Sequence, residues 1–243
     1  MGAKLNKALF LCKNVLNESN ERKDYMDKNN IKTIKLFDDE YPKKLKNIYD
    51  KPTVLFAKGN INLLNEKSVA IVGCRDCSDY GKNVAKKLSY DLAKENICIV
   101  SGLAKGIDTF AHIGALEAGG KTIAVIGSGL DYVYPSENKH LYERIIKNNG
   151  LIVTEYIIGT KPERLNFPAR NRIISALSEA VVVVEAKERS GALITAEFGL
   201  EQGKEVLAVP GNISSVNSKG TNKLIKDGAF IITDYKDILE CLR

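Results

Sequence analysis

The stretch SVAIVGCRDCSDYG, residues 68–81, decides the fold of this 243-residue chain. It opens with a continuous apolar run that ends at a glycine and leads into polar residues. Comparable runs follow downstream: ICIVSG (97–102), KTIAVIGSG (121–129), LIVTEY (151–156), AVVVVEA (180–186), EVLAVPG (205–211) and AFIITD (229–234). Continuous apolar strands of this kind are typical of a parallel sheet that is covered on both faces.

Helical stretches lie between most of these strands. The pattern predicts helices over residues 80–94, 107–117, 137–147, 171–177 and 192–202. Strands that alternate with helices indicate an α/β fold with a doubly wound, mostly parallel sheet. Because ligands of such sheets bind beyond the carboxyl ends of the strands, we expect the loops that follow the strands to converge on one crevice.

The beginning of the chain has a different character. Residues 1–50 are polar and rich in Lys and Asn, and we expect a short helical appendage there, with weak helical spacing around 5–16 and a second polar stretch over 21–30. A strand is expected over 53–57, after two X-Pro steps. The main domain is therefore expected to span residues 51–243.

Composition excludes several classes of protein. Hydrophobic residues make up 44% and charged residues 27%, a balance that is ordinary for a globular chain and argues against disorder. No apolar run approaches the roughly 18 residues of a membrane span, and no leader cleavage site follows the start, so we expect a cytoplasmic protein. Five cysteines, an odd number, argue against a disulfide framework.

The net charge of +6 is modest. Residues 1–66 hold 13 basic and 9 acidic residues, whereas residues 67–243 hold 23 and 21. A site for nucleic acid must therefore be a local group of Arg and Lys.

The first loop does not fit a dinucleotide-binding fingerprint. Residues 73–81 depart from G-x-G-x-x-G, and the next strand ends in Ser101-Gly102, where an acidic residue would hold a ribose hydroxyl. A nicotinamide-dependent dehydrogenase is therefore disfavoured. Arg75 instead places a guanidinium beside a helix start, which suits a phosphate, and an ordinary surface arginine is the alternative.

The second loop, residues 101–112, is also rich in small residues. Gly102 and Gly106 permit close backbone approach, and Ser101 and Asp108 can cap the helix or bind ligand hydroxyls. We expect His112 to pack against the sheet and not to act in catalysis.

The segment GTKPERLNFPARNRII, residues 159–174, has the composition of a nucleic-acid contact. Its cations surround one aromatic residue, Phe167, and Pro162 and Pro168 are expected to forbid an uninterrupted helix. Cations interleaved with an aromatic ring are typical of sites for single-stranded nucleic acid, with a solvated loop of chance charge as the alternative. The residues concerned are Lys161, Arg164, Arg170 and Arg172, together with the amide of Asn171.

A third helix start follows the most apolar strand, where Ser190, Gly191 and Thr195 are expected to form an anion site. The segment is similar to the Pro-Gly-Gly-x-Gly-Thr-x-x-Glu signature of phosphoribohydrolases, but Phe198 stands where their catalytic carboxylate belongs. Cys74 and Cys77 form a single C-x-x-C without a second pair, so zinc is not expected and a redox role stays an alternative.

Taken together, the motifs from residues 41 to 229 resemble those of the DNA-processing protein A (DprA/Smf) family. They include VAIVGCRDCSDYG, SGLAKGIDTFAH, FPARNRIISALSEAVVVVEA and RSGALITAEF. The resemblance implies an extended Rossmann-like domain that binds single-stranded DNA without catalysis, cofactor or metal. It also implies a homodimer that protects incoming DNA and loads a RecA-type recombinase in natural transformation.

The family's usual Gly-Ser-Arg becomes Gly73-Cys74-Arg75 here, which retains the arginine and loses a hydroxyl. Many relatives carry a C-terminal winged-helix domain, and none is expected in this chain. A phosphoribohydrolase-like enzyme and a nucleotide-sensing module remain the alternatives. The resemblance and the loop analysis together predict DNA contacts from Gly73, Arg75, Ser101, Gly102, Asp108, Lys161, Phe167, Arg170, Asn171, Arg172, Ser190, Gly191 and Thr195.

Overall fold

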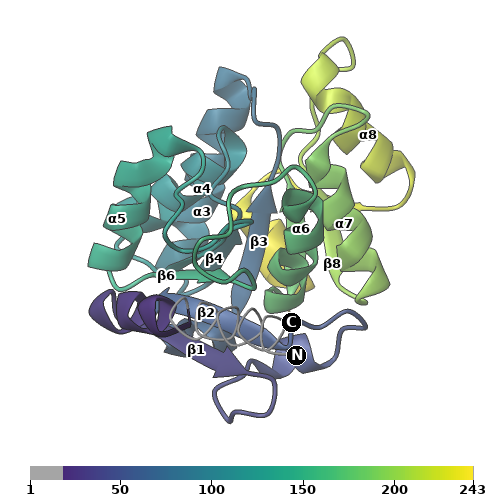
Figure 1. The fold of residues 1–243 in the computed structure, drawn as a ribbon. Helices are drawn as coiled ribbons and strands as arrows, with labels where there is room; N and C mark the ends of the chain where they lie inside the picture. Colours follow the sequence, from purple (N-terminus) through teal and green to yellow (C-terminus); the bar gives the residue numbers. More distant parts are fainter. Residues whose placement is uncertain (1–18, 243) are drawn as a thin grey trace, which may run out of the picture.

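The computed structural model describes residues 19–242, and within them nine strands form one sheet in the order β1-β2-β6-β5-β4-β3-β7-β8-β9 (Figure 1). The strands are β1 (Ile31–Lys35), β2 (Val54–Gly59), β3 (Ser68–Val72), β4 (Cys98–Ser101), β5 (Thr122–Val125), β6 (Leu151–Thr154), β7 (Ala180–Val183), β8 (Glu205–Ala208) and β9 (Phe230–Ile231). Only the β1–β2 and β2–β6 pairs of these strands are antiparallel. The expected doubly wound, mostly parallel, extended Rossmann-like sheet is confirmed.

Helices cover both faces of the sheet, as Figure 1 shows. One face is covered by α2 (Lys43–Lys46), α6 (Asn166–Leu177), α7 (Gly191–Glu201) and α8 (Lys219–Lys226). The other face is covered by α3 (Asp79–Lys94), α4 (Ile107–Glu117), α5 (Lys139–Lys147) and α9 (Tyr235–Cys241). Among the residues that the structure describes, no helix is both long enough and apolar enough to cross a membrane.

The side chains of β3 alternate between two hydrophobic cores. Ala70 and Val72 belong to the core beneath α6 and α7, and Val69 and Ile71 belong to the core beneath α3 and α4. All four are buried, which explains why the strand reads as an unbroken apolar run.

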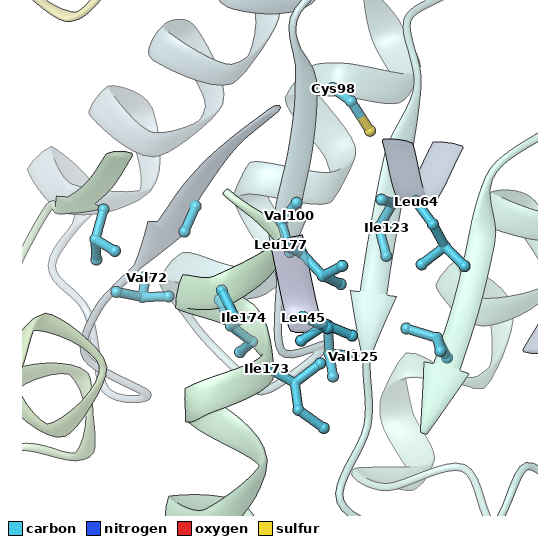
Figure 2. Packing of buried hydrophobic residues seen from close by; sticks show 14 of the residues in the cluster. Leu45, Leu64, Val72, Cys98, Val100, Ile123, Val125, Ile173, Ile174 and Leu177 are labelled. Carbon is cyan, nitrogen blue, oxygen red and sulfur yellow. The ribbon is translucent and has the colours of Figure 1, made fainter. Parts of the chain in front are cut away.

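Helix α6 is fixed to the sheet by its apolar residues. Figure 2 shows Ile173, Ile174 and Leu177 packed among strand side chains that include Val72 and Val125. The three α6 residues are at most 1% exposed, so this part of the helix is held firmly on the sheet. The residues before Ile173 are thereby positioned at the carboxyl edge of the strands.

Several elements differ from the expectations. The predicted helix around residues 5–16 lies outside the described residues, while residues 19–28 are helical. Strand β1 was not predicted. It pairs with β2, so the sheet extends across the boundary expected between residues 50 and 51. Helices α8 and α9 were not predicted either.

Helix α6 begins at Asn166, five residues earlier than predicted, and it includes Pro168. Residues 159–174 do not form one uninterrupted helix, as expected, and Pro162 lies before α6, but Pro168 lies within its first turn. Proline is tolerated there because the first four N–H groups of a helix have no intrahelical partner.

The chain order places a topological switch point between β3 and β7. Strands β4, β5 and β6 follow β3 on one side, whereas β8 and β9 follow β7 on the other. The loops after β3 and β7 therefore diverge to opposite faces and leave room between them, which is the usual position of a ligand crevice in such sheets.

Candidate functional site

A cavity of about 590 Å³ lies at this switch point. Its walls come from the loop after β3, the loop after β7 and the amino-terminal part of α6. The residues that line it include Gly73, Cys74, Arg75, Asp76, Asp108, Tyr134, Arg164, Phe167, Arg170, Asn171, Lys187, Arg189, Ser190 and Gly191. Loops far apart in sequence thus meet in one site, as expected.

An aromatic and cationic platform forms one wall of the cavity. The Arg75 guanidinium lies 5.4 Å from the centre of the Phe167 ring, within the range of a cation–π contact. The Tyr134 ring lies 5.4 Å from the Phe167 ring, with an angle of 40° between the two planes. Arg75 and Tyr134 are exposed, so this surface is accessible to a planar or charged ligand.

Arg170 is a buried cation that lines the same cavity, with 4% of its surface exposed. Its Nη1 donates to the carbonyl oxygens of Gly102, at 2.8 Å, and Val125, and its Nε donates to Asn171 Oδ1 at 3.2 Å. These acceptors are neutral. Burial lowers the pKa of Arg170 to about 10, and the nearby Asp108 opposes this shift. The guanidinium remains charged at neutral pH, and Asp108 balances part of this charge.

Asp108 lies beside Arg170 at the start of α4. Its Oδ2 accepts a hydrogen bond from the Gly102 N–H at 3.0 Å. Burial raises the pKa of Asp108 to about 6, although the positive charge of Arg170 acts in the opposite direction. The close approach of these groups requires a glycine at position 102, because a Cβ there would lie 2.6 Å from Arg170 Nη2 and 2.7 Å from Asp108 Oδ2.

The amino terminus of α7 forms the opposite wall. The Ser190 hydroxyl caps the helix by accepting from the Ala192 N–H at 3.3 Å, and the Asn171 amide donates to the Gly191 carbonyl at 3.1 Å. The positive end of the helix dipole therefore faces the cavity. Exposed Lys187 and Arg189 lie just before this helix start.

The structure brings most of the predicted contacts together. Eight of the predicted residues line the cavity: Gly73, Arg75, Asp108, Phe167, Arg170, Asn171, Ser190 and Gly191. Gly102 lines a smaller adjoining cavity with Arg75, Phe167 and Arg170. Among the other lining residues are Arg164, which the sequence placed in the cationic segment, and Tyr134, Lys187 and Arg189, which were not predicted as contacts. Their charges and aromatic ring were visible in the sequence, but only the fold shows that these side chains face the cavity.

Arg172 was predicted as a DNA contact, but it does not line the cavity. Its guanidinium donates to both oxygens of Glu155, at 2.5 and 2.7 Å, and to the Asp50 carbonyl at 2.7 Å. Two residues that are separated by one position on a helix lie about 200° apart around its axis. Arg170 and Arg172 therefore face opposite sides of α6.

Three further predicted residues lie outside the cavity. The Ser101 hydroxyl is buried and donates to the Ile71 carbonyl at 2.7 Å, and Thr195 is 1% exposed within α7. Lys161 is exposed but does not line the cavity. A contact between DNA and any of these residues stays a prediction.

The Glu185 carboxylate, which follows β7, is engaged by the start of α3. Glu185 is 2% exposed, and its carboxylate accepts from the Ser78 N–H at 2.9 Å and the Ser78 hydroxyl at 2.5 Å. It thereby caps the start of α3. In residues 19–242, no three side chains of His, Cys, Asp or Glu are grouped as metal ligands.

His112 is buried against the sheet. Its Nδ1 lies 2.7 Å from the Thr122 hydroxyl, which itself donates to the Ile99 carbonyl, so Nδ1 carries the proton. Burial lowers the pKa of His112 to about 3. The side chain is neutral at physiological pH and does not reach the cavity.

Comparisons with known proteins identify the chain's relatives. The family model for DNA recombination-mediator protein A matches residues 32–243. The DNA processing protein DprA of Streptococcus pneumoniae is 50% identical over 207 residues, which cover 85% of this chain and 73% of that protein. Its X-ray structure matches with a TM-score of 0.83 and 46% identity over 90% of this chain and 77% of that one.

A second solved structure is that of DNA processing protein A from Helicobacter pylori. It matches with a TM-score of 0.78 and 33% identity over 87% of this chain and 95% of that chain. That structure is described as giving insight into a unique single-stranded-DNA-binding mode.

Proposed function

Because this chain belongs to the DNA recombination-mediator protein A family, we propose that it binds single-stranded DNA in the cavity at the switch point and acts as a recombination mediator without catalytic turnover. The observation that carries this proposal is the exposed platform of Arg75, Phe167 and Tyr134 beside the buried cation Arg170.

The two kinds of side chain in the cavity suit the two parts of a nucleotide. Phe167 and Tyr134 offer rings on which bases can stack, and this contact is tolerant of sequence because every base has an aromatic face. The cations Arg75, Lys187 and Arg189 are placed to neutralise phosphates. Binding should therefore depend on salt and strand length more than on base sequence.

The engaged state of Glu185 supports a binding role over the hydrolase alternative. A hydrolytic carboxylate must be free to accept or donate a proton, and both oxygens of Glu185 are occupied by Ser78 at the start of α3. Phe198 also lacks any ionisable group at the position where the related hydrolases carry their acid.

The nucleotide-sensing alternative rests on Arg170 and the α7 start, which would suit the phosphate of a single nucleotide equally well. The dependence of affinity on strand length separates a nucleotide sensor from a DNA-binding protein. A sensor binds a mononucleotide and a long strand with similar affinity per site, whereas a DNA-binding surface gains affinity with each added contact.

We further propose the cellular role that the resemblance implies, namely protection of incoming single-stranded DNA and loading of a RecA-type recombinase during natural transformation. We also propose a homodimer. One cavity can hold only a few nucleotides, and two linked sites raise the overall affinity through effective concentration. Exposed Phe230 and Ile231 on the edge strand β9 are apolar side chains available for such an interface.

The proposed function is tested by titrating fluorescent oligothymidines of graded length against the protein at several salt concentrations. We expect affinity to rise with length and to fall with salt, and a nucleoside monophosphate to compete poorly. Tight binding of the free nucleotide with no gain from length would favour the sensor. Release of free base from the nucleotide would favour the enzyme.

A further inference from the structure

Two cysteines bracket Arg75 in the segment Cys74-Arg75-Asp76-Cys77, which the proposed function leaves unused. Both are free thiols. Cys74 is buried and lines the cavity, whereas Cys77 is half-buried. The exposed cation of the binding platform therefore lies within a four-residue loop that has a thiol at each end.

The ends of this loop are held close together by Glu185. The Cys74 N–H donates to the Glu185 carbonyl at 2.8 Å, and the Ser78 N–H and hydroxyl donate to the Glu185 carboxylate. The backbone also bends at both Arg75 and Asp76. One residue thus joins the two ends of a tight bend, and Cys77 immediately precedes the second of these anchor points.

Both thiols have a raised pKa. Burial raises the pKa of Cys77, and negative charge on Glu185 and on Cys74 raises it further. Burial also raises the pKa of Cys74, while a hydrogen bond from the Lys187 backbone to its sulfur opposes this shift. Both groups are mainly protonated near neutral pH, so exchange should be slow and should accelerate as the pH rises.

We propose that Cys74 and Cys77 form a thiol–disulfide modification site that controls DNA binding through Arg75, with a small disulfide such as oxidised glutathione as the oxidant. The regulatory part of this inference rests on the proposed function. The existence of the disulfide does not, because it is measured without DNA.

The chemistry proceeds by two exchanges. The more exposed Cys77 attacks, as a thiolate, one sulfur of glutathione disulfide, so that a Cys77–glutathione bond forms and one glutathione leaves and takes up a proton. The Cys74 thiolate then attacks the Cys77 sulfur, and the second glutathione leaves and is protonated in turn. Two cysteine thiols lose two electrons, and one glutathione disulfide gains them as two thiols.

The disulfide changes the position of Arg75. We expect formation of the disulfide to draw the Cys74 sulfur away from the Lys187 N–H and to tighten the bend that carries Arg75. Asp76 shares this bend, and its carbonyl accepts a hydrogen bond from Asn217 at 2.9 Å, which we expect to lengthen as well. We expect Arg75 to leave the Phe167 ring and the oxidised protein to bind DNA about tenfold more weakly, with a salt slope flatter by about 0.7 because one phosphate contact is lost.

The test uses the full chain in anaerobic glutathione buffers of graded redox ratio. Disulfides are mapped by alkylation, proteolysis and mass spectrometry, and binding of a fluorescent oligothymidine is measured in the same buffers. Cys77→Ser removes one partner, and Cys241→Ser is the matched control, because Cys241 is also a half-buried free thiol.

We expect a Cys74–Cys77 disulfide and weaker binding in the parent and in the control, reversed by dithiothreitol, and neither change in Cys77→Ser. Absence of that disulfide at every redox ratio would overturn the modification site. A disulfide that leaves affinity unchanged would overturn its control of binding. Failure of the reduced parent to bind DNA would instead refute the proposed function, and the disulfide mapping would still decide whether the modification site exists.

Discussion

Arg75→Ala is expected to weaken binding of single-stranded DNA while leaving stability nearly unchanged, and Arg172→Ala is expected to do the reverse. Arg75 is exposed and contacts the Phe167 ring. Arg172, with a side chain 7% exposed, is bound to both oxygens of Glu155. The two variants remove the same charge, so they separate a ligand contact from a structural ion pair.

The magnitudes follow from these surroundings. Among the described residues, the cavity is lined by four exposed cations, so a strand that engages all of them should give a slope of log K against log salt near −3, at about −0.7 for each phosphate neutralised. Arg75→Ala should flatten this slope by about 0.7, and Arg75→Lys should restore only part of the affinity because the ammonium lacks the planar fork. Arg172→Ala leaves Glu155 without its cation, and loss of one partner of a buried pair costs about 3–5 kcal/mol.

Binding is measured by fluorescence anisotropy of a labelled oligothymidine across a salt series, and stability by urea denaturation of the same preparations. The reasoning would be refuted by an Arg75→Ala variant that binds like the parent at every salt concentration. It would also be refuted by an Arg172→Ala variant that unfolds like the parent but shows the flatter slope, because the guanidinium would then contact DNA and not Glu155.

Three other outcomes are expected. Phe167→Ala should weaken binding by about 1–3 kcal/mol with the salt slope nearly unchanged, because stacking involves no counterion release; a changed slope in anisotropy titrations would contradict this role. Gly102→Ala should lower the free energy of unfolding by about 1–3 kcal/mol, because the added Cβ would lie 2.6 Å from Arg170 Nη2. A urea midpoint equal to that of the parent would show that the loop accommodates the Cβ without cost. His112→Asn, which can still donate to Thr122, should reduce the loss of stability in acid. Burial lowers the pKa of His112 from 6.5 to about 3, so the unfolded chain binds a proton that the folded protein excludes. The parent therefore loses up to about 1.4 kcal/mol of stability per pH unit as the pH falls from 6.5 toward 3. Urea midpoints measured across this range would count against that account if parent and variant fell in parallel.

The sheet and the first binding loop could be predicted from sequence because both depend on local pattern. The apolar run of β3 and the glycine that follows it identify a buried strand that turns toward a helix, and Arg75 lies where that turn must occur. Helix α4 was predicted with the bounds that it has in the structure.

The remaining differences have non-local causes. Strand β1 has little apolar character of its own, and its identity depends on pairing with β2. Arg170 and Arg172 look equivalent in a list of cations, and only the earlier start of α6 shows that they face opposite sides. Because residues 159–170 were predicted to be a loop, the sequence did not show that Arg170 and Arg172 lie on opposite sides of one helix. Tyr134 likewise joins Phe167 only through the tertiary fold.

The three consecutive residues Arg170, Asn171 and Arg172 have consequences for how this chain can evolve. Each is committed to a different neighbour: Arg170 to the carbonyls of the cavity, Asn171 to the Gly191 carbonyl of α7, and Arg172 to Glu155. None of the three can therefore compensate for the loss of another, and Arg170 and Asn171 also depend on each other through the hydrogen bond from Arg170 Nε to Asn171 Oδ1. Saturation mutagenesis of α6 should therefore show three adjacent intolerant positions, each of which depends on a distant partner on a different element.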